Sequence, residues 1–448
     1  MREVATARDH YQAEFDHFAA HRALAAEPAW LLSLRRNAAA LLAERGFPTS
    51  RDEEWRYTSV AKIVREPLRL FDAAPLTARE LAGVGVDLWD GPQLVFVNGY
   101  FAPDLSSVGA LPAGVTVTAL GAAVADPLLA PLAERVLARG IVEPHGFAAL
   151  CGAFATDGAF VHVPARTVLP QPIHLVFATV ATGAPGLCAV RNVVVADRSS
   201  QCTIVESYLT VGPGKPLALT CAITCLDLAD DAVVDHLRVQ REGQEACHVA
   251  SHQARLARDA SLRSGTYTLG GSLVRNDFAA VLAGEGAECR LAGLFVASRD
   301  QQVDNRTVVD HAVPHCASDQ LFKGIVQDAA SGTFSGKIVV REGAAKTDAR
   351  QSSKNLQLSR TAAVHTKPQL EIYNDDVKCS HGASIGQLDA EALFYLRSRG
   401  LGLDAARALL TYAFAGEVVE GIPVPAVRAA VAAFLLESLP AGDNEVRP

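Results

Sequence analysis

The chain has 448 residues, of which 49% are hydrophobic and 20% are charged, with 34 glycines and 22 prolines. This composition is typical of globular proteins and excludes an intrinsically disordered chain or a collagen-like repeat. The net charge of −8 argues against nucleic acid as a main partner, because phosphate binding requires a concentrated basic surface.

The first residues contain no apolar stretch between their charges, so the sequence predicts no secretion signal and a cytoplasmic protein. The most apolar late segment, from Pro425 to Leu436, contains Arg428 and is shorter than the about 20 residues that a membrane span needs. We therefore expect no membrane partner. The nine cysteines are an odd number spread along the chain, which favours reduced thiols over disulfides.

The N-terminal region reads as mainly helical. Apolar residues recur at helical spacing from Arg8 to Arg45, which predicts two packed helices that end at the sequence RGFP. Asn98 and Gly99 stand between two apolar runs and predict a tight hairpin. The segment from Ala119 to Arg139 then predicts a further helix.

From Phe154 to Tyr373 the sequence changes to short segments of valine, isoleucine, leucine and threonine, separated by turn residues. Three segments that begin at Asp231, Asp259 and Gly286 each place an alanine after the turn residue and before a strand-like run. Their regular spacing suggests stacked coils, as in a β-helix or solenoid, with an irregular β-sandwich as the alternative.

After His381 the pattern becomes helical again. Asp389 is suited to cap a helix that Gly400 ends, Asp404 is suited to cap the next helix, and Pro425 to open a last one. We expect the tail at residues 440–448 to be disordered.

The most distinctive short motif is CSHG, with Cys379 and His381 two residues apart. On an extended strand both side chains would point to one face, about 6.6 Å apart along the strand. Thiolate and imidazole suit iron, zinc or copper, whereas hard cations would prefer the carboxylates of Asp375 and Asp376. Two ligands do not complete a metal site. A packed cysteine with a hydrogen-bonded histidine, and a cysteine nucleophile activated by His381, stay open as alternatives.

Two other segments contain histidine or cysteine residues at short spacing. The segment DHAVPHC offers His311, His315 and Cys316, but Pro314 argues against the helix that would bring them together. Cys221 and Cys225 alternate along a strand-like segment, which predicts buried packing.

Several long motifs resemble the SufB/SufD family. They are FSGKIVVREGAAKTDARQSSKNLQLS at 334–359, KPQLEIYNDDVKCSHGASIGQLD at 367–389, ALFYLRSRGL at 392–401 and the earlier RDEEWRYTSV at 51–60. The form of the CSHG motif is similar to that of SufD-type members, and the SufB-type cysteine cluster is absent.

The resemblance implies a right-handed parallel β-helix core with helical regions on either side. The expected division is an N-terminal helical and mixed region at 1–150, a β-helix at 151–387 and a C-terminal helical domain at 388–448. It also implies a non-catalytic subunit of a cytoplasmic iron-sulfur cluster assembly complex, which pairs with SufB and binds the ABC-type ATPase SufC through that last domain.

For the site, the resemblance implies that His381 lies at the interface with SufB, where a nascent cluster forms, and Cys379 matches with a less certain role. SufB would supply the missing ligands, and no cofactor would be tightly bound to the isolated chain. A homodimer is expected to be possible in isolation. The alternatives are a stand-alone iron carrier and a β-helix enzyme acting on carbohydrate.

Overall fold

The structure is a computed structural model that describes residues 2–21, 27–66, 68–84, 89, 91–140, 144–180, 183–212 and 217–438. The tail at 440–448 lies outside the described residues. The α-helices are α1 (Arg2–His21), α2 (Ala29–Arg45), α3 (Ala61–Arg65), α4 (Ala78–Ala82), α5 (Leu120–Ala125), α6 (Ala130–Leu137), α7 (Gly146–Phe154), α8 (Ala390–Ser398), α9 (Leu403–Glu420) and α10 (Pro425–Ser438). Two short 3-10 helices are η2 (Glu53–Trp55) and η3 (Pro103–Leu105).

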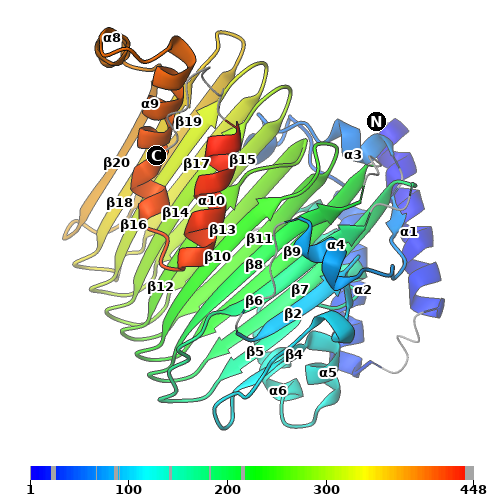
Figure 1. The fold of residues 1–448 in the computed structure, drawn as a ribbon. Coiled ribbons are helices and arrows are strands. Elements are labelled where there is room, and N and C mark those ends of the chain that lie inside the picture. Colours follow the sequence, from blue (N-terminus) through cyan, green and yellow to red (C-terminus); the bar gives the residue numbers. More distant parts are fainter. Residues whose placement is uncertain are drawn as a thin grey trace.

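The strands form one continuous stack, which Figure 1 shows from the N-terminal end in cyan to the C-terminal end in orange. They are β1 (Arg69–Leu70), β2 (Gln93–Val97), β3 (Tyr100–Phe101), β4 (Thr116–Ala119), β5 (Ala159–Val163), β6 (Ile173–Val180), β7 (Gly186–Ala196), β8 (Gln201–Val211), β9 (Ala218–Leu228), β10 (Val233–Arg241), β11 (Cys247–Leu256), β12 (Ser261–Thr268), β13 (Leu273–Leu282), β14 (Glu288–Ala297), β15 (Gln302–His311), β16 (Ala317–Val326), β17 (Ser331–Val340), β18 (Asp348–Gln357), β19 (Ala363–Ile372) and β20 (Lys378–Gly386).

Successive strands alternate between two ten-stranded sheets. The sheet with β5, β7 and the later odd-numbered strands, called sheet A below, ends at β19, and the sheet with the even-numbered strands, called sheet B, ends at β20. Each strand of the stack pairs in parallel with the strand one coil away. This arrangement is a β-solenoid with helices at both ends of the chain, so the β-helix expectation is confirmed and the β-sandwich is wrong.

The repeated turns have a common physical basis. Asp231, Asp259 and Gly286 have φ angles of 59°, 54° and 76°, in the left-handed region that aspartate and glycine tolerate best. The alanine that follows each of them is completely buried, because closely stacked turns favour a small side chain (Ala232, Ala260 and Ala287). The repeated turn pattern in the sequence therefore marks the same corner of three successive coils, which leads into β10, β12 and β14.

The N-terminal helices cover the outer face of sheet A (Figure 1). Apolar side chains of α1, α2 and α7 share one core with outward-facing residues of β7 and β9. The two helices expected between Arg8 and Arg45 are confirmed, and so is the hairpin, in which Asn98 and Gly99 join β2 to β3. The segment from Ala119 to Arg139 is helical as expected, but in two pieces, α5 and α6, because the chain breaks at Asp126, the residue before a proline.

The RDEEWRYTSV segment crosses the outer face of sheet A. The Arg275 guanidinium lies over the Trp55 ring at 4.1 Å from its centre, and Tyr57 stacks on His365 at 4.0 Å. This segment connects the N-terminal region to β19 near the far end of the stack.

The C-terminal helices α9 and α10 pack on the outer face of sheet B, across the front in Figure 1. Lys323 of β16 fixes α9 there, because its Nζ donates to the carbonyl of Phe414 at 2.6 Å and pairs with Glu417 at 2.7 Å. Asp389 caps α8 as expected, but α9 is preceded by Gly402 as its N-cap, so the cap assigned to Asp404 is wrong. Among the described helices, none is long and apolar enough to cross a membrane.

Candidate functional site

The C-terminal end of the solenoid is open. Strands β19 and β20 each pair with one neighbour, β17 and β18 respectively, and have no strand on their other side within the described residues. Residues of β19 are half-buried, whereas those of β20 are almost all exposed. Two unpaired parallel edges of this length are a ready template for another chain.

Cys379 and His381 lie on β20, as the sequence predicted, and face the same side of that strand. The register pairs them with Ala349 and Gln351 of β18, which are buried in the solenoid interior. Both side chains therefore point along the interior face of the last coil, where no further coil covers them. His381 is exposed and Cys379 is half-buried.

The surroundings of the two residues differ. Burial raises the pKa of the Cys379 thiol above its usual value, and the carboxylate of Asp348 on β18 adds to the shift. Cys379 packs against a small apolar cluster that includes Ile338 and Ala349. The nearby Asp376 is paired with Lys346 at 2.7 Å, so the structure does not bring its carboxylate to the thiol and imidazole. The end of the stack thus presents two soft donors and an incomplete ligand set.

The DHAVPHC residues do not come together. His311 is buried and its Nε2 lies 2.9 Å from Ser318 Oγ, whereas His315 is exposed at a turn and 3.7 Å from Glu285. The Cys316 thiol lies 3.4 Å from the carbonyl of Gly284. Local contacts therefore account for the position of each of these three residues. Cys221 and Cys225 are buried in the core beneath α7, which confirms the packing prediction.

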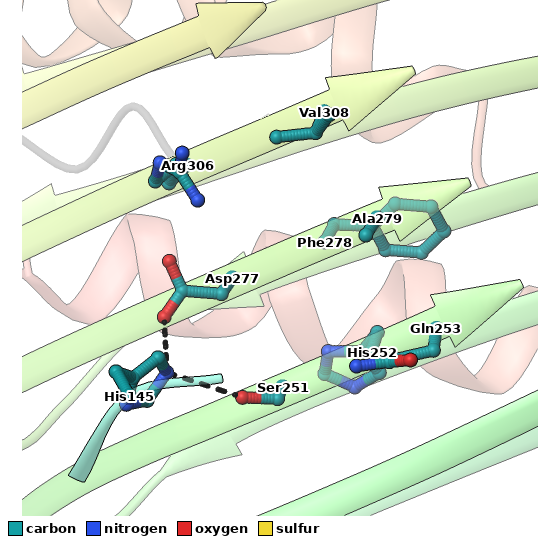
Figure 2. Close-up of a pocket in the computed structure, with 9 residues that line it drawn as sticks. All are labelled: His145, Ser251, His252, Gln253, Asp277, Phe278, Ala279, Arg306 and Val308. Atoms are coloured by element: carbon teal, nitrogen blue, oxygen red, sulfur yellow. Dashed lines mark hydrogen bonds and ion pairs between the residues drawn. The ribbon is translucent and has the colours of Figure 1, made fainter. Parts of the chain in front are cut away.

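A pocket on sheet A contains serine, histidine and aspartate but lacks the geometry of a catalytic triad (Figure 2). His145 Nε2 faces both Ser251 Oγ at 3.5 Å and Asp277 Oδ2 at 3.2 Å. Its Nδ1 accepts from the Ala148 backbone N–H, which caps α7. A triad requires the two ring nitrogens to serve serine and aspartate separately, so His145 is a structural residue.

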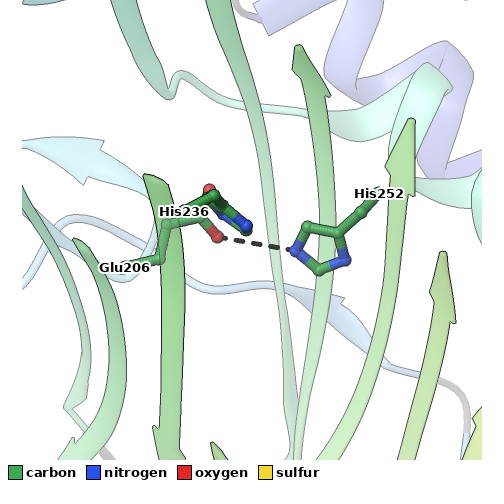
Figure 3. Close-up of side chains that lie close together, drawn as sticks. All are labelled: Glu206, His236 and His252. Carbon is green, nitrogen blue, oxygen red and sulfur yellow. Dashed lines mark ion pairs between the residues drawn. The ribbon is translucent and has the colours of Figure 1, made fainter. Parts of the chain in front are cut away.

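A buried group inside the solenoid was not predicted from the sequence. It consists of Glu206 and His236 of sheet B and His252 of sheet A (Figure 3). These residues are far apart in the sequence, and no short motif joins them. The sequence pattern that could have indicated the group is a set of polar residues about one coil apart, each at a position that faces the solenoid interior.

Fold and site together define a class of protein: a β-solenoid with helices on the outer faces of both sheets, which ends in an open pair of strands that carry a thiol and an imidazole. Two family models match the chain, the SufBD protein N-terminal region over residues 7–175 and the SufBD core domain of the SUF system for FeS cluster assembly over residues 178–414. The chain belongs to the SufBD family of iron-sulfur cluster assembly proteins.

Curated relatives agree over nearly the whole length. The chain is 34% identical to an iron-sulfur cluster assembly SufBD family protein of Synechocystis, over 90% of both chains. It is 29% identical to the iron-sulfur cluster assembly protein SufD of Escherichia coli, over 90% of this chain and 91% of that one. It is 27% identical to the iron-sulfur cluster assembly protein SufD of Bacillus subtilis, over 90% of this chain and 92% of that one. A role in the Suf system follows from this membership.

The exposure of the thiols leads to a direct prediction. Eight of the nine cysteines are buried and only Cys379 is half-buried, so a maleimide should label one thiol per folded chain and all nine in denaturant. Labelling should be slower than that of a free thiol, because the raised pKa lowers the thiolate fraction. Intact-protein mass spectrometry measures the count. In Cys379→Ser the native label should disappear, and persistent labelling would contradict the burial of the other eight.

Proposed function

We propose that this chain is a SufD-type scaffold subunit of a cytoplasmic assembly complex, with a SufB-like paralogue at its open end and a SufC-like ATPase on its C-terminal helices. In this role it performs no catalysis alone, and the ATPase supplies the energy. The single observation that supports the proposal best is the pair of unpaired edge strands carrying Cys379 and His381 in a member of the SufBD family.

The open end has the properties of an obligate interface. Its two free strand edges can continue into the sheets of another solenoid, which would satisfy their backbone N–H and C=O groups. Apolar side chains also remain uncovered there, with exposures of 40% for Ile372, 61% for Tyr373 and 49% for Ile385. A paralogue with the same coil geometry matches both features. In its absence a second copy of this chain would meet the same requirement, which supports a homodimer of the isolated protein.

The nascent iron-sulfur cluster, or iron, is the substrate of this interface. His381 and Cys379 offer one nitrogen and one sulfur, and a structural tetrahedral site needs four donors. We assign the remaining donors to the SufB-like partner. A site divided between two subunits can open when the subunits move, which allows a finished cluster to leave.

Helix α8 is the surface that suits the ATPase. It has no buried residue, and it exposes 74% of Phe394 and 56% of Tyr395. In contrast, α9 and α10 are occupied on one side by their packing on sheet B. Exposed aromatic residues on a projecting helix are typical anchors of a protein interface.

The two alternatives have less support. A carbohydrate-active enzyme needs a pair of carboxylates across a groove, whereas the pocket in Figure 2 is lined by one carboxylate, Asp277, which is already paired with Arg275 and His145. A stand-alone iron carrier needs a complete ligand set of its own at the open end, and Cys379 with His381 supplies only part of one.

The first prediction concerns the cluster site. His381→Ala should lower the cluster yield of the reconstituted complex by about 10-fold or more, the scale expected when a group that supports a metal site is lost. The measurement is anaerobic reconstitution followed by visible absorption and iron analysis. His315→Ala is the matched control, because His315 is an exposed imidazole at a turn of the same solenoid. Equal yields from both variants would remove His381 from the site.

The second prediction concerns the paired edges. Ile385→Lys places a charge on the interior-facing side of β20, so it should abolish co-purification with the SufB-like partner and also dimerisation of the isolated chain. Because Ile385 is exposed in the single chain, the fold should survive. Ser384→Lys, on the opposite side of the same strand, serves as control. Undiminished binding by the Ile385 variant, measured by pull-down and light scattering, would refute the edge assignment.

The third prediction concerns the ATPase. Replacing Phe394 and Tyr395 together by alanine should weaken SufC-like ATPase binding by about 2 kcal/mol or more, roughly 30-fold in Kd. Isothermal titration calorimetry measures the change, with Leu436→Ala on α10 as control for an exposed apolar residue. Deleting residues 388–448 is a poorer test, because it would also uncover the apolar outer face of sheet B. Wild-type affinity in the double variant would place the docking surface elsewhere.

A further inference from the structure

The interior of the solenoid contains three buried side chains that converge across the gap between the sheets. Glu206 on β8 and His236 on β10 come from sheet B, and His252 on β11 comes from sheet A (Figure 3). Their ligand atoms all lie within 4.8 Å of one another, and the side chains are 2% exposed or less. We propose that this group is a binding site for a resident divalent transition-metal ion, separate from the open end.

The distances suit such an ion. Glu206 Oε1 lies 3.4 Å from His236 Nε2, and Glu206 Oε2 lies 3.8 Å from His252 Nε2. Ligands held about 2.0–2.1 Å from a tetrahedral zinc-like ion are themselves about 3.3 Å apart. A small inward shift of the three side chains would therefore bring them to bonding distance of one ion, with the fourth position left for a water molecule.

The hydrogen bonds leave the right atoms available. His236 Nδ1 is engaged by Ser264 Oγ at 2.9 Å, whereas its Nε2 and that of His252 are buried without a hydrogen bond in the described structure. A metal-binding histidine typically has this arrangement, in which the second ring nitrogen is held by a neighbouring polar group. The two imidazole nitrogens meet one carboxylate only at ion-pair distances of 3.4 and 3.8 Å, and a cation between the three groups would give each of them a direct ligand bond.

Glu206 is held in place by its own donors. Oε1 accepts from Thr224 Oγ1 at 2.7 Å and Oε2 accepts from Tyr208 O–H at 3.0 Å, while Asn192 makes a longer contact of 3.4 Å. A carboxylate has about four lone-pair sites, so at least one remains for a metal. The buried guanidinium of Arg238 does not take that place: in the described structure it is bound to Asn276 and forms no ion pair with Glu206.

The donor set selects the class of ion. Two imidazoles and one carboxylate suit Zn²⁺, Fe²⁺ or Co²⁺, whereas Mg²⁺ and Ca²⁺ prefer oxygen ligands alone. An ion here would connect the two sheets across the interior. The site is distinct from the cluster site, because His236 and His381 occupy one register column five strands apart, or about 24 Å at the usual strand spacing.

The test uses Co²⁺ as the probe and the full-length chain with no histidine tag. The protein is expressed in minimal medium with Co²⁺, so that it folds in the presence of the metal, and cobalt is measured by mass spectrometry and visible d–d absorption. We expect stoichiometric cobalt in the wild type. Three variants each remove one ligand: Glu206→Gln, His236→Gln and His252→Gln. In each, the affinity for cobalt should fall by more than about 10–100-fold, which is the loss seen when a residue that only supports a ligand is changed.

The matched control is Glu242→Gln. Glu242 is also a buried carboxylate inside the solenoid, but it makes an ordinary hydrogen-bonded contact of 2.7 Å with the single imidazole of His248. This control should keep its cobalt, and so should Cys379→Ser and His381→Ala. If these last two variants fail in cluster assembly while they keep cobalt, the defect lies at the open end only. Circular dichroism checks that every variant is folded.

A second measurement keeps the inference testable if a variant does not fold. The cobalt spectrum of Cys379→Ser should show d–d bands without thiolate charge-transfer absorption, as nitrogen and oxygen ligands require. Wild-type protein without stoichiometric cobalt would overturn the proposal. Cobalt retained by Glu206→Gln, or a Cys379→Ser protein without d–d absorption, would overturn it as well.

Discussion

The parallel pairing of each strand with the strand one coil away is the constraint on which the structure depends. A single coil buries its apolar side chains only when another coil lies above and below it, so stability accumulates by stacking. The first coils are finished by the β2–β3 hairpin, by the antiparallel pair of β4 and β5, and by N-terminal helices. The last coil has no such cover within the described residues. The exposed strand edges therefore arise where the repeat stops and the stacking requirement is unmet.

The same constraint explains why the interior can hold polar side chains. Inward positions alternate with outward ones along each strand, and the register repeats them in columns from coil to coil. The column that contains His236 continues through Ser264, Gln320 and Gln351 to His381. Where such a column lies within the stack, its polar groups can bond to groups of the facing sheet, as Gln320 Oε1 does by accepting from Thr307 Oγ1 at 2.6 Å. At the end of the column, no further coil of the described residues covers His381.

Local sequence signals predicted the coil corners because the cause is local. A left-handed residue followed by a small buried residue forms this corner, and the sequence displays it at Asp231 and Asp259. Predictions failed where long-range packing decides. Asp404 has the chemistry of a helix cap, yet the chain enters α9 two residues earlier through Gly402. Pro314 argues against a joint site of His311 and Cys316, and this agrees with the structure, in which the two residues make separate contacts.

The two candidate metal sites differ in how they could be recognised. Cys379 and His381 are two residues apart, so a strand of period two places them on one face whatever the rest of the fold does. Glu206, His236 and His252 meet only after two sheets have stacked and faced each other, so their relation depends on the register of three strands. A short motif finds the first kind of site, and only the folded solenoid reveals the second. The difference also has a physical consequence: a pair at the end of the stack can share its ligand with another subunit, whereas a group enclosed by both sheets can serve only this chain.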